Sequence, residues 1–267
     1  MRGRVLVVAG SDSGGGAGIQ ADIKTITALD GYAMTAITAI TAQNTQGVSA
    51  VEAAAPVIIA EQIRVTLEDL GCDVVKTGMM ADVPTIEAAA DALDAWAGEV
   101  PRVVDPVMVA KGGQRLLAED AVGALKTRLI AKAALVTPNA PEAEALTGVT
   151  VTGAGDMETA GRAFLDLGAR AALVKGGHLD GETVIDVLVT AEGVERFEGP
   201  RIKSQHTHGT GCTLASAIAC GLAQGMELSD AVGRARAYVA EAIRTAPGYG
   251  SGHGPLNHSH TVKPFGK

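Results

Sequence analysis

Residues 207–220 read Thr-His-Gly-Thr-Gly-Cys-Thr-Leu-Ala-Ser-Ala-Ile-Ala-Cys, two glycines among small polar residues and then an unbroken small and apolar run. This pattern predicts a buried helix that begins at about Gly211. Unpaired N–H groups of its first turn would hold an anion, and Gly209 and Gly211 would let a phosphate approach the backbone. The same field should lower the pKa of the Cys212 thiol. A glycine turn that opens a core helix with a buried cysteine explains the pattern equally well.

On both sides of this stretch, short apolar runs alternate with helical patterns. Continuous apolar runs are typical of parallel strands buried on both faces, and the last two runs predict an antiparallel pair at a sheet edge. No repeat or linker interrupts the alternation, so we expect one three-layer αβα domain over residues 1–267 with a mostly parallel central sheet. The predicted strands are 5–9, 33–42, 74–76, 102–104, 134–137, 171–174, 183–189 and 194–197. The other predicted helices are 19–29, 56–70, 82–96, 119–129, 156–167 and 228–244.

Composition restricts the class of protein. The formal charge of −8 over 267 residues argues against a nucleic-acid partner, because such proteins cluster Lys and Arg. No apolar stretch approaches the ~20 residues needed to cross a bilayer, and the run 5–9 is too short for a signal-peptide core. The three cysteines, Cys72, Cys212 and Cys220, are far apart and should be reduced. These features predict a cytoplasmic enzyme without a membrane partner.

The first strand leads into a glycine-rich loop. Gly10 is followed by Ser-Asp-Ser-Gly-Gly-Gly-Ala-Gly and then by a helical pattern. The loop lacks the lysine of a phosphate loop and the acid of the dinucleotide fingerprint, so we expect it to enclose a small molecule. Asp22, in the first turn of the following helix, could accept hydrogen bonds from that molecule. Favourable charge placement near a helix start would also account for it.

Two polar or polarisable side chains follow the next strands. Gln43 comes at the end of the strand 33–42, where open α/β sheets bind ligands, and its amide could pair with a ring nitrogen and an exocyclic amine. An ordinary polar loop is the alternative. Met79 follows the strand 74–76, and its thioether could contact a flat ring or simply fill space.

Further along the chain, Asn139 and Glu142 lie three residues apart at the start of a helix. This spacing predicts a capping box, and it would also suit water-mediated magnesium binding. Lys175 ends the strand 171–174 beside two glycines, where its charge can reach a phosphate.

Two segments allow two interpretations each. Gly112 and Gly113 predict either a mobile tip that closes over a ligand or a simple hairpin turn. The tail histidines suggest a metal site, although their irregular spacing favours a frayed terminus. They are His253, His258 and His260.

Taken together, six motifs in this order resemble the hydroxymethylpyrimidine/phosphomethylpyrimidine kinases of thiamine biosynthesis, a family of the ribokinase superfamily. The similarity extends from residue 5 to about the last helix. It implies a commonly dimeric ribokinase-like sandwich that uses ATP and Mg²⁺. The implied reaction phosphorylates the hydroxymethyl group of 4-amino-5-hydroxymethyl-2-methylpyrimidine and then the resulting monophosphate. The motifs occupy residues 10–22, 42–44, 105–108, 137–142, 175–178 and 207–212.

The resemblance also implies roles for individual residues. The pyrimidine site would be lined by Gly10, Asp22, Gln43, Met79, Val107 and Cys212. The ATP site would comprise Asp105, Thr137, Asn139, Glu142, Lys175 and Thr210, with Asp105 and Glu142 on magnesium, directly or through water. The anion hole would be formed by Gly209, Thr210 and Gly211, and Cys212 would be the base.

The sequence departs from the family pattern at Ser13-Gly14, where Pro-Ser is usual, and at Gly112 after Lys111, where Ser is frequent. Sugar kinases of the superfamily mostly carry Asp in place of Cys212, whereas pyrimidine kinases carry Cys. Some bacterial pyridoxal kinases share the Cys, so a pyridoxal or pyridoxine kinase is the main alternative. A non-catalytic pyrimidine-binding protein is a second alternative, against which the intact Cys212, Lys175 and Glu142 set argues.

Overall fold

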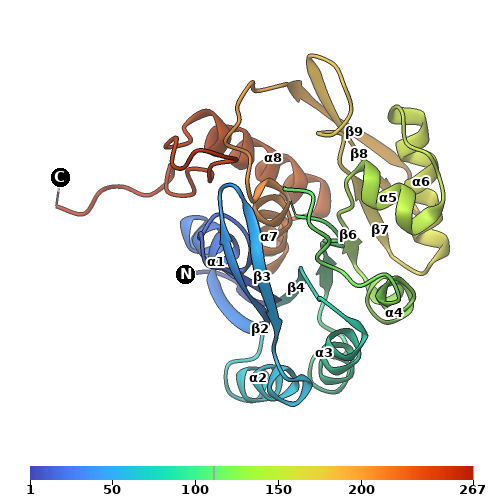
Figure 1. Cartoon of the computed structure of the whole chain (residues 1–267). Helices are drawn as coiled ribbons and strands as arrows, with labels where there is room; N and C mark the ends of the chain where they lie inside the picture. The colour runs from blue at the N-terminus through green and yellow to red at the C-terminus, as the bar shows by residue number, and fades with distance from the viewer. Residues whose placement is uncertain (111, 267) are drawn as a thin grey trace.

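The computed structural model describes residues 1–110 and 112–266, and in it a nine-stranded sheet has the order β3-β2-β1-β4-β5-β6-β7-β8-β9 (Figure 1). Neighbouring strands pair in parallel from β2 through β1, β4, β5 and β6 to β7. At the two edges, β3, β8 and β9 pair antiparallel with their neighbours. The α/β class is confirmed, but the sheet is mixed. The strands are β1 (Arg4–Asp12), β2 (Tyr32–Asn44), β3 (Gly47–Ala53), β4 (Val74–Thr77), β5 (Arg102–Val104), β6 (Leu135–Val136), β7 (Ala171–Val174), β8 (Thr183–Thr190) and β9 (Val194–Pro200).

The antiparallel pair β8–β9 was expected, but β3 was missed. Its seven residues, Gly47–Ala53, are exposed or half-buried, so no apolar run marks them. They form a strand because β2 offers its free edge to a returning chain.

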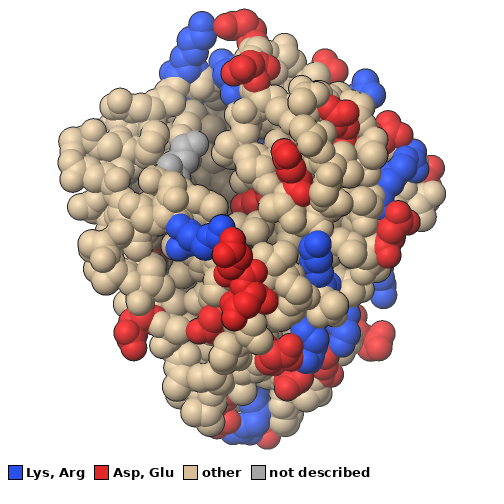
Figure 2. Space-filling model, turned by 45° about the vertical axis from the view of Figure 1, so that its right-hand side comes forward, with Lys and Arg blue, Asp and Glu red and all other residues tan. Residues whose placement is uncertain are grey.

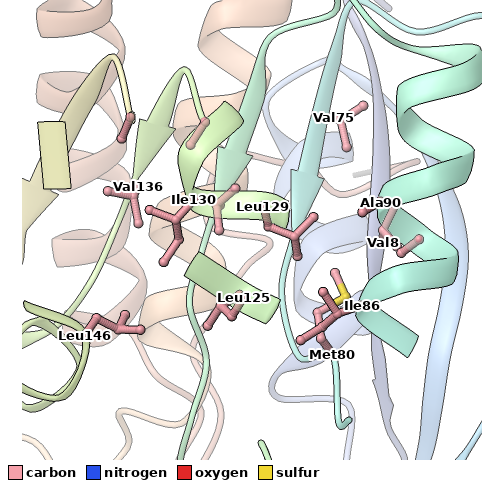
Figure 3. Packing of buried hydrophobic residues seen from close by; sticks show 14 of the residues in the cluster. Val8, Val75, Met80, Ile86, Ala90, Leu125, Leu129, Ile130, Val136 and Leu146 are labelled. Carbon is pink, nitrogen blue, oxygen red and sulfur yellow. The ribbon is translucent and has the colours of Figure 1, made fainter. Parts of the chain in front are cut away.

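Helices cover both faces of the sheet and enclose two hydrophobic cores, which gives three layers. In the first core, Val8 and Val75 of the sheet pack against Ile86 and Ala90 (Figure 3). This face carries α2 (Pro56–Asp69), α3 (Val83–Trp96), α4 (Ala121–Ala124), α5 (Ala140–Thr147) and α6 (Ala154–Asp166). The other face carries α1 (Gly18–Ala28), α7 (Thr210–Ala223) and α8 (Leu228–Arg244).

The small residues of α7 allow close packing. A Cβ on Gly221 would lie 2.9 Å from the Cβ of Ala231 in α8, so only glycine permits this approach. None of the helices described is both long and apolar enough to span a membrane.

One helix differs from the sequence expectation. Instead of a single helix over 119–129, α4 ends at Ala124 and the chain continues as a π-turn (Leu125–Leu129) and a 3-10 turn (Ile130–Lys132). The wider turn places Leu125, Leu129 and Ile130 together in the core.

Residues 253–260 are packed against the fold, so the expectation that this histidine-containing segment is frayed was wrong, whereas residues 261–266 are exposed. His258 is buried, its Nε2 lies 3.0 Å from Thr213 Oγ1 of α7, and its carbonyl accepts a hydrogen bond from the Tyr238 hydroxyl at 2.6 Å. The His260 ring packs against the Tyr238 ring at 4.5 Å between centroids, with the two planes tilted by 39°. Burial lowers the pKa of His258 to about 4. Periodicity could not reveal this irregular segment, because its contacts are with distant helices.

Candidate active site

The carboxyl ends of the central strands and the beginning of α7 surround a cleft of about 1080 Å³. Figure 2 shows a deep hollow on this face of the molecule, with mostly uncharged residues around it. The cleft brings together most of the site residues expected from the sequence: Gly10, Gln43, Met79, Asp105, Val107, Asn139, Glu142, Lys175, Gly209, Thr210, Gly211 and Cys212. Asp22 and Thr137 are fully buried and do not border it.

The turn before α7 requires glycine. Gly209 caps the helix with φ +84°, and a Cβ there would lie 1.8 Å from the carbonyl oxygen of Gly16. The turn therefore packs directly on the glycine-rich loop after β1. Helix α7 begins at Thr210, one residue before the predicted start, and its first turn borders the cleft, where the positive end of the helix dipole would stabilise an anion.

Asp12 holds the glycine-rich loop in place. Its carboxylate accepts hydrogen bonds from the amides of Gly14 (2.8 Å), Gly16 (3.0 Å) and Ala17 (2.8 Å), and His208 Nε2 lies 2.8 Å from Oδ2. Burial acts to raise the pKa of Asp12, but these hydrogen bonds outweigh it and lower the pKa. Sequence reasoning gave Asp12 no role, although an Asp preceding glycines is a signal for such a turn.

Gln43 and Met79 form one wall of the cleft. Gln43 Oε1 accepts a hydrogen bond from Thr41 Oγ1 at 3.0 Å, and its Nε2 lies 3.3 Å from His208 Nε2. The amide is therefore held in the wall rather than in a free polar loop. A Cβ on Gly10 would lie 3.0 Å from Met79 Sδ, so glycine at this strand end keeps room for the thioether.

A buried ion pair forms the floor below the start of α7. Lys175 Nζ lies 3.0 Å from Asp105 Oδ1, and Thr137 Oγ1 donates to the same oxygen at 3.0 Å. A side chain on Gly211 would approach Lys175 Nζ to 3.4 Å. Burial acts to lower the pKa of Lys175, but Asp105 and Glu142 outweigh it and raise the pKa, so the ammonium stays charged.

Asn139 and Glu142 form the expected capping box at the start of α5. Asn139 Oδ1 accepts from the Glu142 amide at 2.9 Å, and Glu142 Oε2 accepts from the Asn139 amide at 2.8 Å. Burial raises the pKa of Glu142 to about 7, against the opposing effect of Lys175. Within residues 1–110 and 112–266, no three His, Cys, Asp or Glu side chains are grouped as a ready-made metal site.

Replacing Asn139 by alanine is expected to lower the free energy of unfolding by about 1 kcal/mol, because the cap is lost, and to lower the rate of the reaction that the resemblance implies as well. The matched control is Asp82→Ala. Asp82 caps α3 by accepting from the Thr85 amide at 2.9 Å and does not border the cleft. Thermal unfolding should shift by about 2–4 °C in both variants. If neither variant changed the reaction rate, the role of Asn139 would be limited to capping α5.

The structure corrects the expectation for the Cys212 thiol. Burial raises its pKa to about 12; Lys76 acts in the opposite direction, and Asp22 and Asp105 add to the rise. The expected lowering by the helix terminus was wrong because the loss of solvation outweighs it. Cys212 nevertheless borders the cleft, as a residue that meets substrate must.

Asp22 does not face the glycine-rich loop. Its two carboxylate oxygens each lie 3.0 Å from Lys76 Nζ, and Ser216 Oγ donates to Oδ1 at 2.6 Å. Lys76 was missed by sequence reasoning. A lysine in the four-residue apolar strand β4 is the signal that could have revealed it.

The loop after β5 forms a tight turn. The Ala110 amide donates to the Gln114 carbonyl at 2.8 Å and the Gly113 amide to the Ala110 carbonyl at 2.8 Å, as in the simple hairpin interpretation. Gly112, where the sequence departs from the family pattern, lies within this turn, whereas Lys111 lies outside the described residues.

A mixed sheet between two helical layers, with a helix N-terminus, a lysine and buried carboxylates around one cleft, defines an α/β kinase of the ribokinase-like fold. The family model of phosphomethylpyrimidine kinase matches residues 12–257, and the chain belongs to this family.

Relatives match over almost the whole chain. The thiamine biosynthesis bifunctional protein ThiED of Geobacter sulfurreducens is 52% identical over 257 residues, which are 96% of this chain and 52% of the relative. The chain thus spans about half the length of that protein. The hydroxymethylpyrimidine/phosphomethylpyrimidine kinase of Streptomyces coelicolor is 47% identical, with 95% of this chain and 93% of the relative covered.

Solved structures agree with the fold. The ADP complex of Bacillus subtilis pyridoxal kinase has a TM-score of 0.89 at 35% identity, with 97% of this chain and 98% of that chain covered. The phosphomethylpyrimidine kinase of Clostridium difficile has a TM-score of 0.80 at 43% identity, with 90% and 99% covered.

Proposed function

We propose that the chain acts as a single kinase domain that transfers the γ-phosphoryl group of ATP to 4-amino-5-hydroxymethyl-2-methylpyrimidine and then to its monophosphate. The observation that carries the proposal is the Lys175–Asp105 ion pair, which lies against the start of α7 in the cleft that Cys212 borders. Membership of the phosphomethylpyrimidine kinase family and the names of the relatives support this substrate.

For ATP, the N–H groups of Gly209, Thr210 and Gly211 and the ammonium of Lys175 would hold the phosphates. The ADP bound to Bacillus subtilis pyridoxal kinase supports use of this nucleotide. Thr137 acts indirectly, by orienting the Asp105 carboxylate through its hydrogen bond. Backbone amides and one fixed cation stabilise the charge on a transferring phosphoryl group without reorganisation.

The residues also fit Mg²⁺, which favours carboxylate oxygens and retains several waters. The hydrogen bonds that Thr137 and Lys175 donate to the Asp105 carboxylate both go to Oδ1, which leaves Oδ2 for a metal-bound water. Glu142 would contribute a second carboxylate. When bound, the metal would neutralise charge on the ATP phosphates.

The pyrimidine would lie against Gly10, Gln43, Met79 and Val107. The amide of Gln43 offers a donor and an acceptor, which match a ring nitrogen and its neighbouring amine. Met79 would contact the face of the ring through sulfur. Asp22 is enclosed by Lys76 and Ser216, so its contribution to this site is indirect.

In the first step, we infer that Cys212 accepts the hydroxyl proton as the new O–P bond forms and the bond to the leaving ADP breaks. Phosphoryl transfer has a loose transition state, so alignment contributes more than the base does. In the second step, the acceptor is an anionic phosphate that needs no deprotonation. The two steps therefore differ in their dependence on the thiol.

The difference predicts distinct pH profiles. Because the pKa of Cys212 is raised to about 12, only a small fraction is thiolate at pH 7, and that fraction grows about tenfold per pH unit. The first phosphorylation should accelerate accordingly between pH 7 and 9, while the second should lack this rise. Single-turnover rates with each acceptor provide the measurement. Parallel profiles would speak against Cys212 as the base.

A pyridoxal kinase is the second candidate, because the pyridoxal kinase of Bacillus subtilis superposes at a TM-score of 0.89. Side-by-side ATP assays with hydroxymethylpyrimidine and pyridoxal separate the two. We expect kcat/KM to favour the pyrimidine and both mono- and diphosphate products to appear. Higher efficiency with pyridoxal would reverse the assignment, and pyrimidine binding without ADP release would indicate a non-catalytic binder.

We further propose a cytoplasmic homodimer. The β2–β3 edge exposes apolar side chains, among them Ile40 at 61% and Val51 at 43%. Such a patch at a sheet edge suits pairing with a second copy. Light scattering coupled to size exclusion should give about twice the mass of the chain, and a monomer would reject this assignment.

A further inference from the structure

Lys76 carries a buried charge that the proposed binding steps leave unused. It lies in the central strand β4, its side chain is 0% exposed, and its ammonium bonds both oxygens of Asp22 at 3.0 Å. Ser216 of α7 donates to the same carboxylate at 2.6 Å. A strand and two helices thus enclose one ammonium, one carboxylate and one hydroxyl beneath the cleft.

Stability alone gives little reason to keep this pair. Removing two ions from water costs several kcal/mol per ion, and apolar side chains of similar volume often fold equally well or better. Burial acts to lower the pKa of Lys76, but the attraction of Asp22 and Cys212 outweighs it and raises the pKa. The ammonium therefore remains charged in a place where a charge is costly.

The register of α7 connects this ion pair with Cys212. Ser216 follows Cys212 by one turn on α7, and Asp22 follows Gly18 by one turn on α1. Because Ser216 bonds Asp22, α1 and α7 are joined one turn beyond Cys212. Residues one turn apart share a helix face, so Cys212 and Ser216 lie one above the other along α7, about 5.4 Å of helix rise apart. Lys76 and Cys212 both border the cleft.

Four charged groups from four elements act on the sulfur. Lys76 on β4 and Lys175 after β7 favour the thiolate, whereas Asp22 on α1 and Asp105 after β5 disfavour it. Lys175 is paired with Asp105, and its ammonium is the group proposed to bind the ATP phosphates. When Lys175 binds phosphates, Lys76 is therefore the cation that still stabilises the Cys212 thiolate.

We propose that Lys76 is a positioning residue for Cys212: its ammonium stabilises the thiolate that receives the hydroxyl proton, while Asp22 and Ser216 hold the ammonium in place. The inference rests on the proposed function. The thiolate takes the proton as the acceptor oxygen bonds to the γ-phosphorus and the bond to ADP breaks. The thiol then returns the proton to solvent.

The test compares two variants that are expected to change the reactivity of the Cys212 thiol in opposite directions. Iodoacetamide alkylation of Cys212, followed by peptide mass mapping between pH 7 and 9, reports the thiolate fraction without turnover. Lys76→Met should slow alkylation by about tenfold or more, because a nearby cation is lost, while Asp22→Asn should accelerate it, because an anion is lost. A purely structural ion pair predicts faster alkylation in both variants, since either one loosens the packing. That result, or no change in either, would overturn the proposal.

Kinetics provide a second measurement. Lys76→Met should lower kcat for the hydroxymethyl acceptor by about tenfold or more and change kcat for the monophosphate acceptor by less than about threefold. Equal losses would overturn the proposal. The control Lys132→Met removes a surface ammonium paired with Asp94 and should leave both rates and the alkylation unchanged. A wild-type protein that phosphorylates no pyrimidine would reject the proposed function, while the alkylation result would still test Lys76.

Either single variant leaves one buried charge unpaired and could fail to fold. In that case, the double variant Lys76→Met with Asp22→Leu replaces the pair by apolar groups of similar size. Because the effect of Lys76 on the thiol exceeds that of Asp22, alkylation of the double variant should still be slower than in the wild type. Alkylation at or above the wild-type rate would overturn the proposal.

Discussion

Replacing Cys212 by alanine is expected to slow phosphorylation of the hydroxymethyl group by about 10²–10⁴-fold, the usual contribution of a general base. Phosphorylation of the monophosphate should fall by less than about tenfold, because its acceptor oxygen is already anionic. The variant removes a small, partly buried side chain that borders the cleft, so the fold should persist. Rates for each acceptor, measured separately, check the expectation.

Cys72→Ala is the matched control for this variant. Cys72 is also partly buried, precedes β4, and does not border the cleft, so both rates should remain near wild type. If Cys212→Ala slowed both phosphorylations equally, the thiol would contribute to the shape of the anion site and not to proton transfer.

Replacing Lys175 by alanine is expected to slow both phosphorylations by about 10²–10³-fold, the range seen when one stabilising donor is removed from a transition state. Its charge acts on the transferring phosphoryl group, which is the same for either acceptor. The variant also leaves Asp105 buried without its cation, which should reduce stability. The thermal unfolding temperature of the variant must therefore be measured together with its two rates.

Binding of ATP, followed by calorimetry, distinguishes the two consequences. A folded Lys175→Ala protein should bind ATP more weakly, whereas Lys132→Ala, at a surface ion pair with Asp94, should bind it normally. An unchanged rate in folded Lys175→Ala would remove this residue from the site.

Much of the fold could be predicted because helices and buried strands have local signatures. The helix expected over 82–96 is observed as Val83–Trp96, and the helix expected over 228–244 is Leu228–Arg244. Periodicity failed where pairing partners decide the structure. Gly47–Ala53 becomes a strand through its pairing with β2, and His258 is ordered by contacts with α7 and α8.

The composition of the cleft could also be derived from the chain, because residues at the carboxyl ends of parallel strands collect at one edge of a sheet. Gln43, Lys175 and the start of α7 meet there as the strand and helix ends predict, and Asp105 joins them as the resemblance implied. Local pattern was sufficient for this, since strand direction and strand ends are themselves local properties.

The charge states in the cleft depended on the packed molecule. The pKa of Cys212 rises instead of falling because other elements exclude water from the sulfur, and Asp22 turns to Lys76 because β4 presents an ammonium to α1. The free energy of ionising a side chain depends on its loss of solvation and on its charged neighbours, and most of these neighbours are distant in the chain. A linear pattern identifies the groups that titrate, but only their packing decides which form each one takes.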